Sequence, residues 1–301
     1  MRRIFLWLLA ALPLVGLRTS ASFDPVPLRI MTSIFPLAEF AKEIAAGRGV
    51  VSLLLPPGAG IHTWQPRASD IVRLSSADLF IQVGAGLEPW INSLLKSISS
   101  ANLKVLAVAD SLPLEEHRHE EDREMEADPH VWLDFGLDIK IADLIAAKLT
   151  EIDPPGAAAY QAGASRLKGR LQELDAAYSQ GLSRCASKDL VIGGHAAFGY
   201  LAKRYGLKAL SLSGLSPDAE ARPSRLMAAV AWGKQHDVRA VFMEANASSQ
   251  MSEMLAQELQ AEILVLHAAA NLNKKEWESG LSFFDIMEQN LVNLKKGLAC
   301  E

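Results

Sequence analysis

The strongest constraint on the fold is a regular alternation of short apolar runs with amphipathic segments, interrupted once by a long helical segment. The short runs have the length and apolar content of strands, and the amphipathic segments have the period of helices. The predicted strands are 28–34, 50–55, 77–83, 104–109, 189–194, 208–213, 238–244 and 262–267. The predicted helices are 36–46, 68–75, 89–97, 196–205, 223–235, 249–260 and 283–298. Strands that alternate with helices in this way predict parallel βαβ units.

The interrupting segment begins at Pro154 and continues to about Ser183 without a helix breaker. Its apolar residues recur at spacings of three, four and seven: Tyr160, Leu167, Leu171, Leu174, Tyr178 and Leu182. Some 28 helical residues would span roughly 40 Å, the length of a domain. We therefore predict an α/β protein of two lobes, each a mainly parallel sheet flanked by helices, joined by one long rigid helix. The predicted parts are an N-terminal lobe 24–152, a linking helix 153–185 and a C-terminal lobe 186–301, and 301 residues suffice for two cores.

Residues 1–21 have the pattern of a secretory signal peptide. Arg2 and Arg3 precede the apolar run 4–17, and small residues at 19–21 provide a cleavage point. The run is shorter than the ~20 residues of a membrane span, so we expect an exported protein of the periplasm. No cysteine lies near the cleavage point, so a lipid anchor is not expected. Removal of this segment takes away three arginines and no acid, which changes the net charge from −5 to −8 and argues against a nucleic-acid partner.

The two cysteines, Cys185 and Cys300, indicate a disulfide, because an exported protein matures in an oxidising compartment. The sequence alone does not show whether they meet in space. They lie far apart and have no nearby third ligand, which argues against a cysteine-type zinc site.

Four of the seven histidines lie at the ends of predicted strands. His62 follows the strand 50–55 on a Pro- and Gly-rich loop, and His130 opens a short strand-like run at 131–135. His195 and His267 each follow the last residues of a strand. A single histidine near a strand is usually structural, but ligands of open α/β sheets bind at the carboxyl edge of the strands. Because imidazole nitrogen is a preferred donor for Zn²⁺, two such histidines from each half predict a metal held between two lobes.

The segment 115–126 is rich in charge and is predicted to form a mobile surface loop. Two interpretations of it stay open. It is either a solvated loop, or an auxiliary loop whose His117 and His119 gather divalent cations weakly near a deeper site. His236, which follows a predicted helix, is expected at the surface.

Five motifs extend this argument to a family. They are Pro-Pro-Gly-x-x-x-His-x-x-x-Pro (56–66), Gly-Ala-Gly-Leu-Glu-Pro-Trp (84–90), Asp-Pro-His-Val-Trp-Leu-Asp (128–134), Gly-His-Ala-Ala-Phe-Gly-Tyr-Leu (194–201) and Met-x-x-Asn-Leu (287–291). In this order, from about 28 to 298, the chain resembles the zinc- and manganese-binding solute receptors of bacterial ABC transporters. The resemblance implies two α/β lobes joined by one long helix, a metal in the cleft, and delivery of that metal to a membrane permease.

The resemblance also implies a ligand set. His62, His130 and His195 match the family's first three ligand positions, and a histidine at the third position is typical of zinc-type members. The fourth position, usually an aspartate or left to water, is occupied by His267. Glu244 is a rival for it, and Asp285 is a weaker one.

Neutral imidazoles suit zinc, whereas manganese favours carboxylate oxygens, so the expected cargo is Zn²⁺. Asp134 and Glu244 are candidate acceptors for the histidines' second N–H groups. We expect a monomeric receptor with an ABC transporter permease as partner, and no enzyme. The alternatives are a manganese or iron receptor of the same fold, an adhesin on the same scaffold, and an exported zinc hydrolase. A hydrolase has little support, because the chain lacks a His-Glu-x-x-His helix and the 193–197 motif has no serine.

Overall fold

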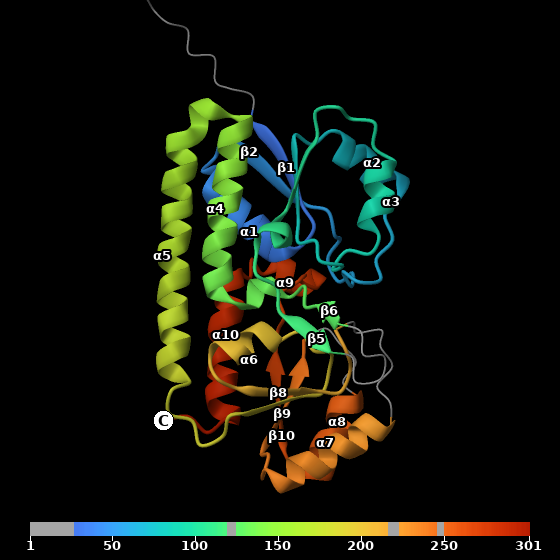
Figure 1. Ribbon diagram of the computed structural model, residues 1–301, viewed down its shortest axis with the longest axis vertical. Coiled ribbons are helices and arrows are strands. Elements are labelled where there is room, and N and C mark those ends of the chain that lie inside the picture. The colour runs from blue at the N-terminus through green and yellow to red at the C-terminus, as the bar shows by residue number, and fades with distance from the viewer. Residues whose placement is uncertain (1–26, 119–124, 216–222, 246–249) are drawn as a thin grey trace, which may run out of the picture.

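The computed structural model describes residues 27–118, 125–215, 223–245 and 250–301 and places one parallel four-stranded sheet in each half of the molecule (Figure 1). The first sheet contains β1 (Leu28–Thr32), β2 (Gly49–Leu53), β3 (Leu79–Gln82) and β4 (Lys104–Ala107) in the order β2-β1-β3-β4. The second contains β7 (Asp189–Ile192), β8 (Lys208–Ser211), β9 (Ala240–Glu244) and β10 (Glu262–Leu266) in the order β10-β9-β7-β8. Counted from β8, the second order repeats the first, as two copies of one βαβ plan would. This confirms the predicted fold class.

Helices flank these sheets at nearly the predicted positions, apart from the short helix α9, which was not predicted. The first lobe has α1 (Phe35–Ala45), α2 (Ala68–Ser75) and α3 (Ile91–Lys96). The second has α6 (Gly199–Arg204), α7 (Pro223–Gln235), α8 (Gln250–Leu259), α9 (Lys274–Glu278) and α10 (Phe283–Gly297). Helix α10 begins at a capping box in which Ser282 and Asp285 accept each other's backbone N–H, which satisfies donors that the first turn leaves unpaired.

The linking helix α5 (Ala157–Gly181) runs along one side of the molecule and contacts both lobes (Figure 1). In the first lobe, Gly163 lies so close to α1 that a Cβ there would come within 2.7 Å of the Glu43 carbonyl oxygen. In the second lobe, the Tyr178 hydroxyl donates to the carbonyl of Met287 in α10, at 2.6 Å. All six apolar positions predicted for this helical segment are buried. A second long helix, α4 (Phe135–Ile152), packs beside α5 and was not predicted.

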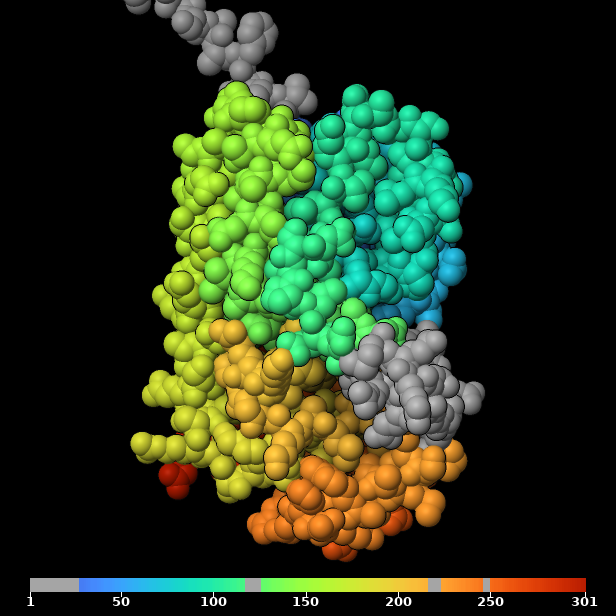
Figure 2. All heavy atoms as spheres, in the orientation of Figure 1, coloured from blue at the N-terminus to red at the C-terminus, as the bar shows by residue number. Residues whose placement is uncertain are grey.

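The hydrophobic core is continuous across the two lobes. Phe283 of α10 packs edge-on against Phe40 of α1, with ring centroids 5.2 Å apart, and against Phe135 of α4 at 6.5 Å. Apolar burial on this scale resists separation of the packed elements. The lobes are therefore joined by packing as well as by the chain. Figure 2 shows that the residues of α5 lie along one side of the surface, beside both the upper and the lower parts of the molecule.

The predicted disulfide between Cys185 and Cys300 is present. It links positions 115 residues apart and connects the segment after α5 to the segment after α10. The end of the linking helix is thereby fastened covalently to the C-terminus of the chain.

Two predictions about local structure were wrong or incomplete. The run 131–135 is not a strand: Val131–Leu133 form a 3-10 helix that leads into α4. The charged loop is flanked by an antiparallel hairpin, β5 (Glu116–Arg118) and β6 (Met125–Ala127). The predicted signal peptide 1–21 and His119 lie outside the described residues. Within the described ranges, none of the helices combines the length and apolar character needed to cross a membrane.

Candidate metal centre

Three of the predicted histidines converge between the lobes. His62, His130 and His195 each bring one ring nitrogen within 4.8 Å of the other two. His62 follows β2 and His130 precedes the turn into α4, whereas His195 follows β7 of the second lobe. The Nε2 atoms of His130 and His195 are 3.2 Å apart, close to the roughly 3.3 Å expected between two ligands of one tetrahedral zinc.

The three rings line a cavity of about 300 Å³. Trp132, Glu244 and His267 also contribute to its walls, together with the loops 58–63 and 268–272. His130 and His195 are only 2% and 5% exposed, whereas His62 is half-buried. The cavity therefore belongs to both lobes, and its donors are mostly shielded from water.

A carboxylate orients each of the two buried rings. Asp128 Oδ1 lies 2.8 Å from Nδ1 of His130, and Glu244 Oε2 lies 2.5 Å from Nδ1 of His195. An ionised carboxylate only accepts hydrogen bonds, so each Nδ1 carries the proton and each Nε2 keeps a free lone pair. The two lone pairs face each other across the site. Imidazoles held in this way are prepared to bind a metal ion.

Of the two predicted acceptors, Glu244 is confirmed and Asp134 is wrong. Asp134 Oδ1 instead accepts the backbone N–H of Gly136 at the start of α4 and pairs with Arg204 at 2.8 Å. The role expected of it is taken by Asp128, which also accepts the backbone N–H of His130 at 2.9 Å. The spacing of Asp128 and His130 could have indicated this, because an aspartate commonly accepts the backbone N–H two residues later.

The surroundings favour the neutral form of the His62 and His130 rings. Burial, together with the neighbouring His130 and His195 rings, lowers the pKa of His62 from 6.5 to about 3. Burial also lowers the pKa of His130, although the adjacent Asp128 acts in the opposite direction. Neutral imidazole is the form that binds a metal, so protons compete weakly for the nitrogens of these two rings at neutral pH.

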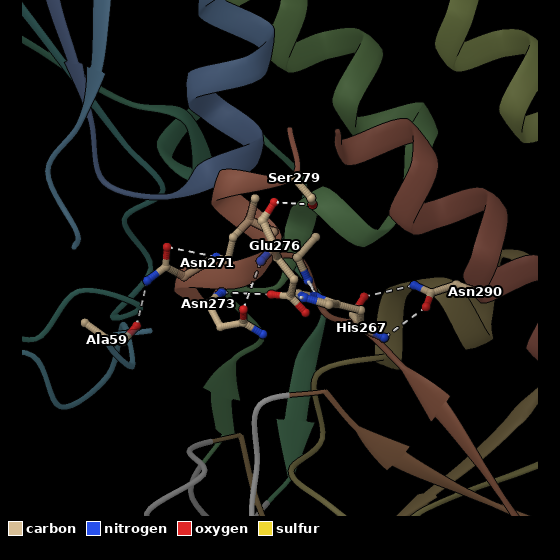
Figure 3. A network of polar contacts seen from close by, with 9 residues as sticks. Ala59, His267, Asn271, Asn273, Glu276, Ser279 and Asn290 are labelled. Carbon is tan, nitrogen blue, oxygen red and sulfur yellow. Dashed lines mark hydrogen bonds and ion pairs between the residues drawn. The ribbon is translucent and has the colours of Figure 1, made fainter. Parts of the chain in front are cut away.

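His267 lines the cavity but is not one of the three converging residues. Its Nδ1 accepts the backbone N–H of Ala269 at 2.8 Å, so the neutral ring carries its proton on Nε2. That Nε2 lies 3.5 Å from Glu276, and Asn290 accepts the backbone N–H of His267 (Figure 3). In this arrangement neither ring nitrogen of His267 offers a free lone pair to the cavity. The identity of the fourth ligand therefore stays a prediction.

The other candidate residues lie in different places. Asp285 Oδ2 caps the first turn of α10, and His117 belongs to β5. His236 is exposed, as predicted; it stacks on Trp232 and lies 3.1 Å from Asp189. The arrangement as a whole is a set of three imidazole nitrogen donors, which suits Zn²⁺, Cu²⁺ or Ni²⁺ better than Mn²⁺.

Comparisons with known proteins find similar zinc-uptake and zinc-binding proteins. The family described as ZnuA, the periplasmic component A of a zinc-uptake complex, matches residues 30–297. The high-affinity zinc uptake system protein ZnuA of Bacillus subtilis is 34% identical over 280 residues, which cover 90% of this chain and 88% of that protein. The zinc-binding lipoprotein AdcA of Streptococcus pneumoniae is 34% identical over 98% of this chain, which spans 61% of AdcA. The crystal structure of the Zn(II)-bound ZnuA-like domain of that AdcA has a TM-score of 0.77 and 32% identity, covering 91% of this chain and 99% of that domain.

Proposed function

The chain belongs to the ZnuA family of periplasmic zinc-uptake components, and we propose that it captures Zn²⁺ and delivers it to an ABC transporter permease. The observation that carries this proposal is the convergence of His62, His130 and His195 from two lobes on one buried point. A site made by both lobes changes when the lobes move, which suits a receptor that must both hold and release its cargo.

In the proposed mechanism the three imidazoles bind the ion through nitrogen. Asp128 and Glu244 hold His130 and His195 with their lone pairs directed into the cavity. Each carboxylate also offsets part of the ion's positive charge without occupying a coordination position. Because the lowered pKa values of His62 and His130 keep these two rings neutral before the ion arrives, capture does not require them to lose protons.

The fourth coordination position has three candidates: a water molecule, His267 and Glu244. Binding through His267 requires its ring to give up either the bond from Ala269 or the proton that faces Glu276. Binding through Glu244 requires it to leave His195. Water requires neither change, and it is the ligand that leaves most easily on transfer to a permease.

The location and partners form part of the same proposal. The signal peptide 1–21 directs export to the periplasm, where the protein acts as a monomer without catalytic activity. The lobes, 24–152 and 186–301, remain connected by the linking helix 153–185, and the Cys185–Cys300 disulfide suits an oxidising compartment. Lobe movement on release is small, because the two lobes share a continuous core.

Substitution of His130 tests the proposal. His130→Ala should weaken zinc binding by at least about a hundredfold, because a buried ligand with its own carboxylate is lost. His236→Ala, which removes an exposed histidine outside the cavity, is the matched control and should leave affinity unchanged. Affinity is measured by competition with a chromophoric chelator, and circular dichroism checks the fold. Equal affinity of the two variants would refute the ligand assignment.

Metal analysis of the purified, dialysed protein separates the alternatives. One equivalent of zinc without hydrolytic activity supports the receptor. A preference for manganese would move the protein to the manganese-type receptors, and zinc-dependent hydrolysis would indicate an enzyme.

A further inference from the structure

His62 is held differently from the other two converging histidines. Among the described residues, none forms a hydrogen bond with its ring; its neighbours are the His130 and His195 rings, at centroid distances of 5.8 and 5.9 Å. No carboxylate of the described residues therefore orients this imidazole. The position of its ring depends on the backbone of the loop that carries it.

That loop, residues 54–63, is held from two sides. Within its own lobe, Trp90 Nε1 donates to the carbonyl of Ile61 at 2.9 Å. From the second lobe, Asn271 Nδ2 donates to the carbonyls of Pro56 at 2.8 Å and Ala59 at 3.0 Å. These acceptors lie on either side of the tight turn at Gly58, where φ is +80°. One amide group thus holds both sides of the turn, and Figure 3 shows it reaching Ala59.

The amide of Asn271 is itself fixed in direction. Its Oδ1 accepts the backbone N–H of Leu272 at 2.9 Å, which leaves the NH₂ group facing the His62 loop. The carbonyl of Leu272 in turn accepts the N–H of Gly58 at 2.8 Å. Three hydrogen bonds therefore connect this point of the second lobe to the loop of the first.

The segment that carries Asn271, residues 267–279, is anchored in both lobes. Asn290 of α10 bonds the backbone N–H and carbonyl of His267, and Asn273 and Glu276 form the capping box of α9 (Figure 3). In the first lobe, Trp132 Nε1 donates to the carbonyl of Ala268 at 2.6 Å. Asn271 therefore projects from a rigid support and does not simply follow the loop that it contacts.

We propose that Asn271 is a positioning residue for zinc: it holds the His62 loop across the cleft, and loss of its two bonds releases His62 from the ion. This inference rests on the proposed function. The donors are essential, because two carbonyl oxygens face the Asn271 side chain and only an NH₂ group can satisfy both. An aspartate of the same shape has no donor and would repel them. Both polar groups of the Asn271 side chain are engaged, the NH₂ by the loop and Oδ1 by Leu272, so the residue acts through His62.

The test compares Asn271→Asp and Asn271→Ala with Asn293→Ala. Asn293 is a matched control, because it also donates from its side chain to a backbone carbonyl, that of Val265, on the edge of the second sheet. Zinc affinity and dissociation rate are measured by chelator competition, and Co²⁺ absorption reports the coordination geometry. Both Asn271 variants should bind zinc about ten- to a hundredfold more weakly, chiefly through faster dissociation, with an altered Co²⁺ spectrum. Asn293→Ala should match the parent protein.

A double substitution tests whether Asn271 acts through His62. In a His62→Ala background, Asn271→Ala should cause no further loss of zinc affinity. An equal loss in both backgrounds would overturn the inference, as would Asn271 variants that match the control. Should Asn271→Asp fail to fold, Asn271→Ala carries the same comparison. If His62→Ala itself leaves zinc affinity unchanged, Asn271 cannot act through His62, and the ligand set of the proposed function fails as well.

Discussion

Asp128 Oδ1 lies 2.8 Å from Nδ1 of His130, and both side chains are almost completely buried. The same oxygen accepts the backbone N–H of His130, so it fixes the ring and the chain that carries it. Glu244 and His195 form the corresponding pair in the second lobe. Each lobe thus supplies one imidazole whose tautomer and direction are set before any ion binds.

Asp128→Asn should weaken zinc binding by about ten- to a hundredfold, because the amide keeps the shape but loses the charge that makes His130 a better donor. The measurement is chelator competition at constant pH. Asp143→Asn is the control, since Asp143 is an exposed residue of α4 paired with Lys168. An Asp128 variant that binds as tightly as this control would contradict the orienting role.

His267→Asp distinguishes the candidates for the fourth ligand. If His267 binds the ion, the variant should retain zinc and accept Mn²⁺ more readily, because a carboxylate oxygen replaces a nitrogen donor. Bound zinc and manganese are measured by elemental analysis after dialysis against equal amounts of both. Unchanged selectivity would favour water or Glu244 at this position.

The metal-free protein should lose stability as the solution becomes acidic. In the folded protein the pKa of His62 is lowered to about 3, below its ordinary value of 6.5. The unfolded chain therefore takes up a proton in this window that the folded chain does not. The stabilising contribution is present above pH 6.5 and is lost as the pH falls towards 3, with a slope of at most about 1.4 kcal/mol per pH unit for one group.

Urea denaturation of the metal-free parent and of His62→Gln at several pH values measures this effect. The variant should show a shallower decline between pH 6.5 and 3. Parallel curves would show that His62 does not titrate as described. His62 should contribute little to any change in zinc affinity between pH 7 and 6, because its ring is already neutral there.

Removal of the disulfide should lower stability without altering the metal centre. Cys185→Ser with Cys300→Ser opens a loop of 115 residues, which should reduce the free energy of unfolding by about 2–4 kcal/mol. Denaturant titration measures the loss, and reduction of the parent protein should reproduce it. Zinc affinity should be unchanged, since the bond lies at the ends of α5 and α10. A large loss of affinity would mean that the bond also fixes the site.

Asp138 of α4 is fully buried, and no hydrogen-bond partner of its carboxyl oxygens is found among the described residues. Burial, and secondarily Asp134, raises its pKa well above the ordinary value. Its contribution to stability is therefore present in acid and is lost as the pH rises through the folded pKa. Asp138→Asn should stabilise the protein by about 1 kcal/mol at pH 8 and by nothing near pH 3. Thermal unfolding at the two pH values checks this; a gain that is equal at both would exclude titration as the cause.

Much of the fold could be predicted because its signals are local. The helix 68–75 was predicted with the bounds that α2 has, and the apolar positions of α5 followed from their period alone. Helix α4 was missed, although its exposed residues Lys140, Asp143, Ala147 and Glu151 recur at the spacings of three and four that are typical of a helix.

The sequence also predicted that His62, His130 and His195 lie near strand ends. Because parallel strands bring their carboxyl ends to one edge of a sheet, it predicted a metal site at that edge. Their convergence on one point could not be predicted from the sequence, because it depends on how the two lobes pack together. The sequence offered Glu244 both as a rival ligand and as an acceptor, and only its approach to His195 from a neighbouring strand shows that it serves as an acceptor.

The sequence by itself determined the βα alternation, the linking helix and the kind of donor that the site contains, since each depends on residue type and short-range spacing. Only the tertiary structure decided that Asp128 orients His130, that His267 turns towards Glu276, and that Asn271 reaches a loop more than 200 positions away. The physical reason is that a side chain's direction and partners depend on the packing of distant elements, whereas local periodicity does not depend on that packing.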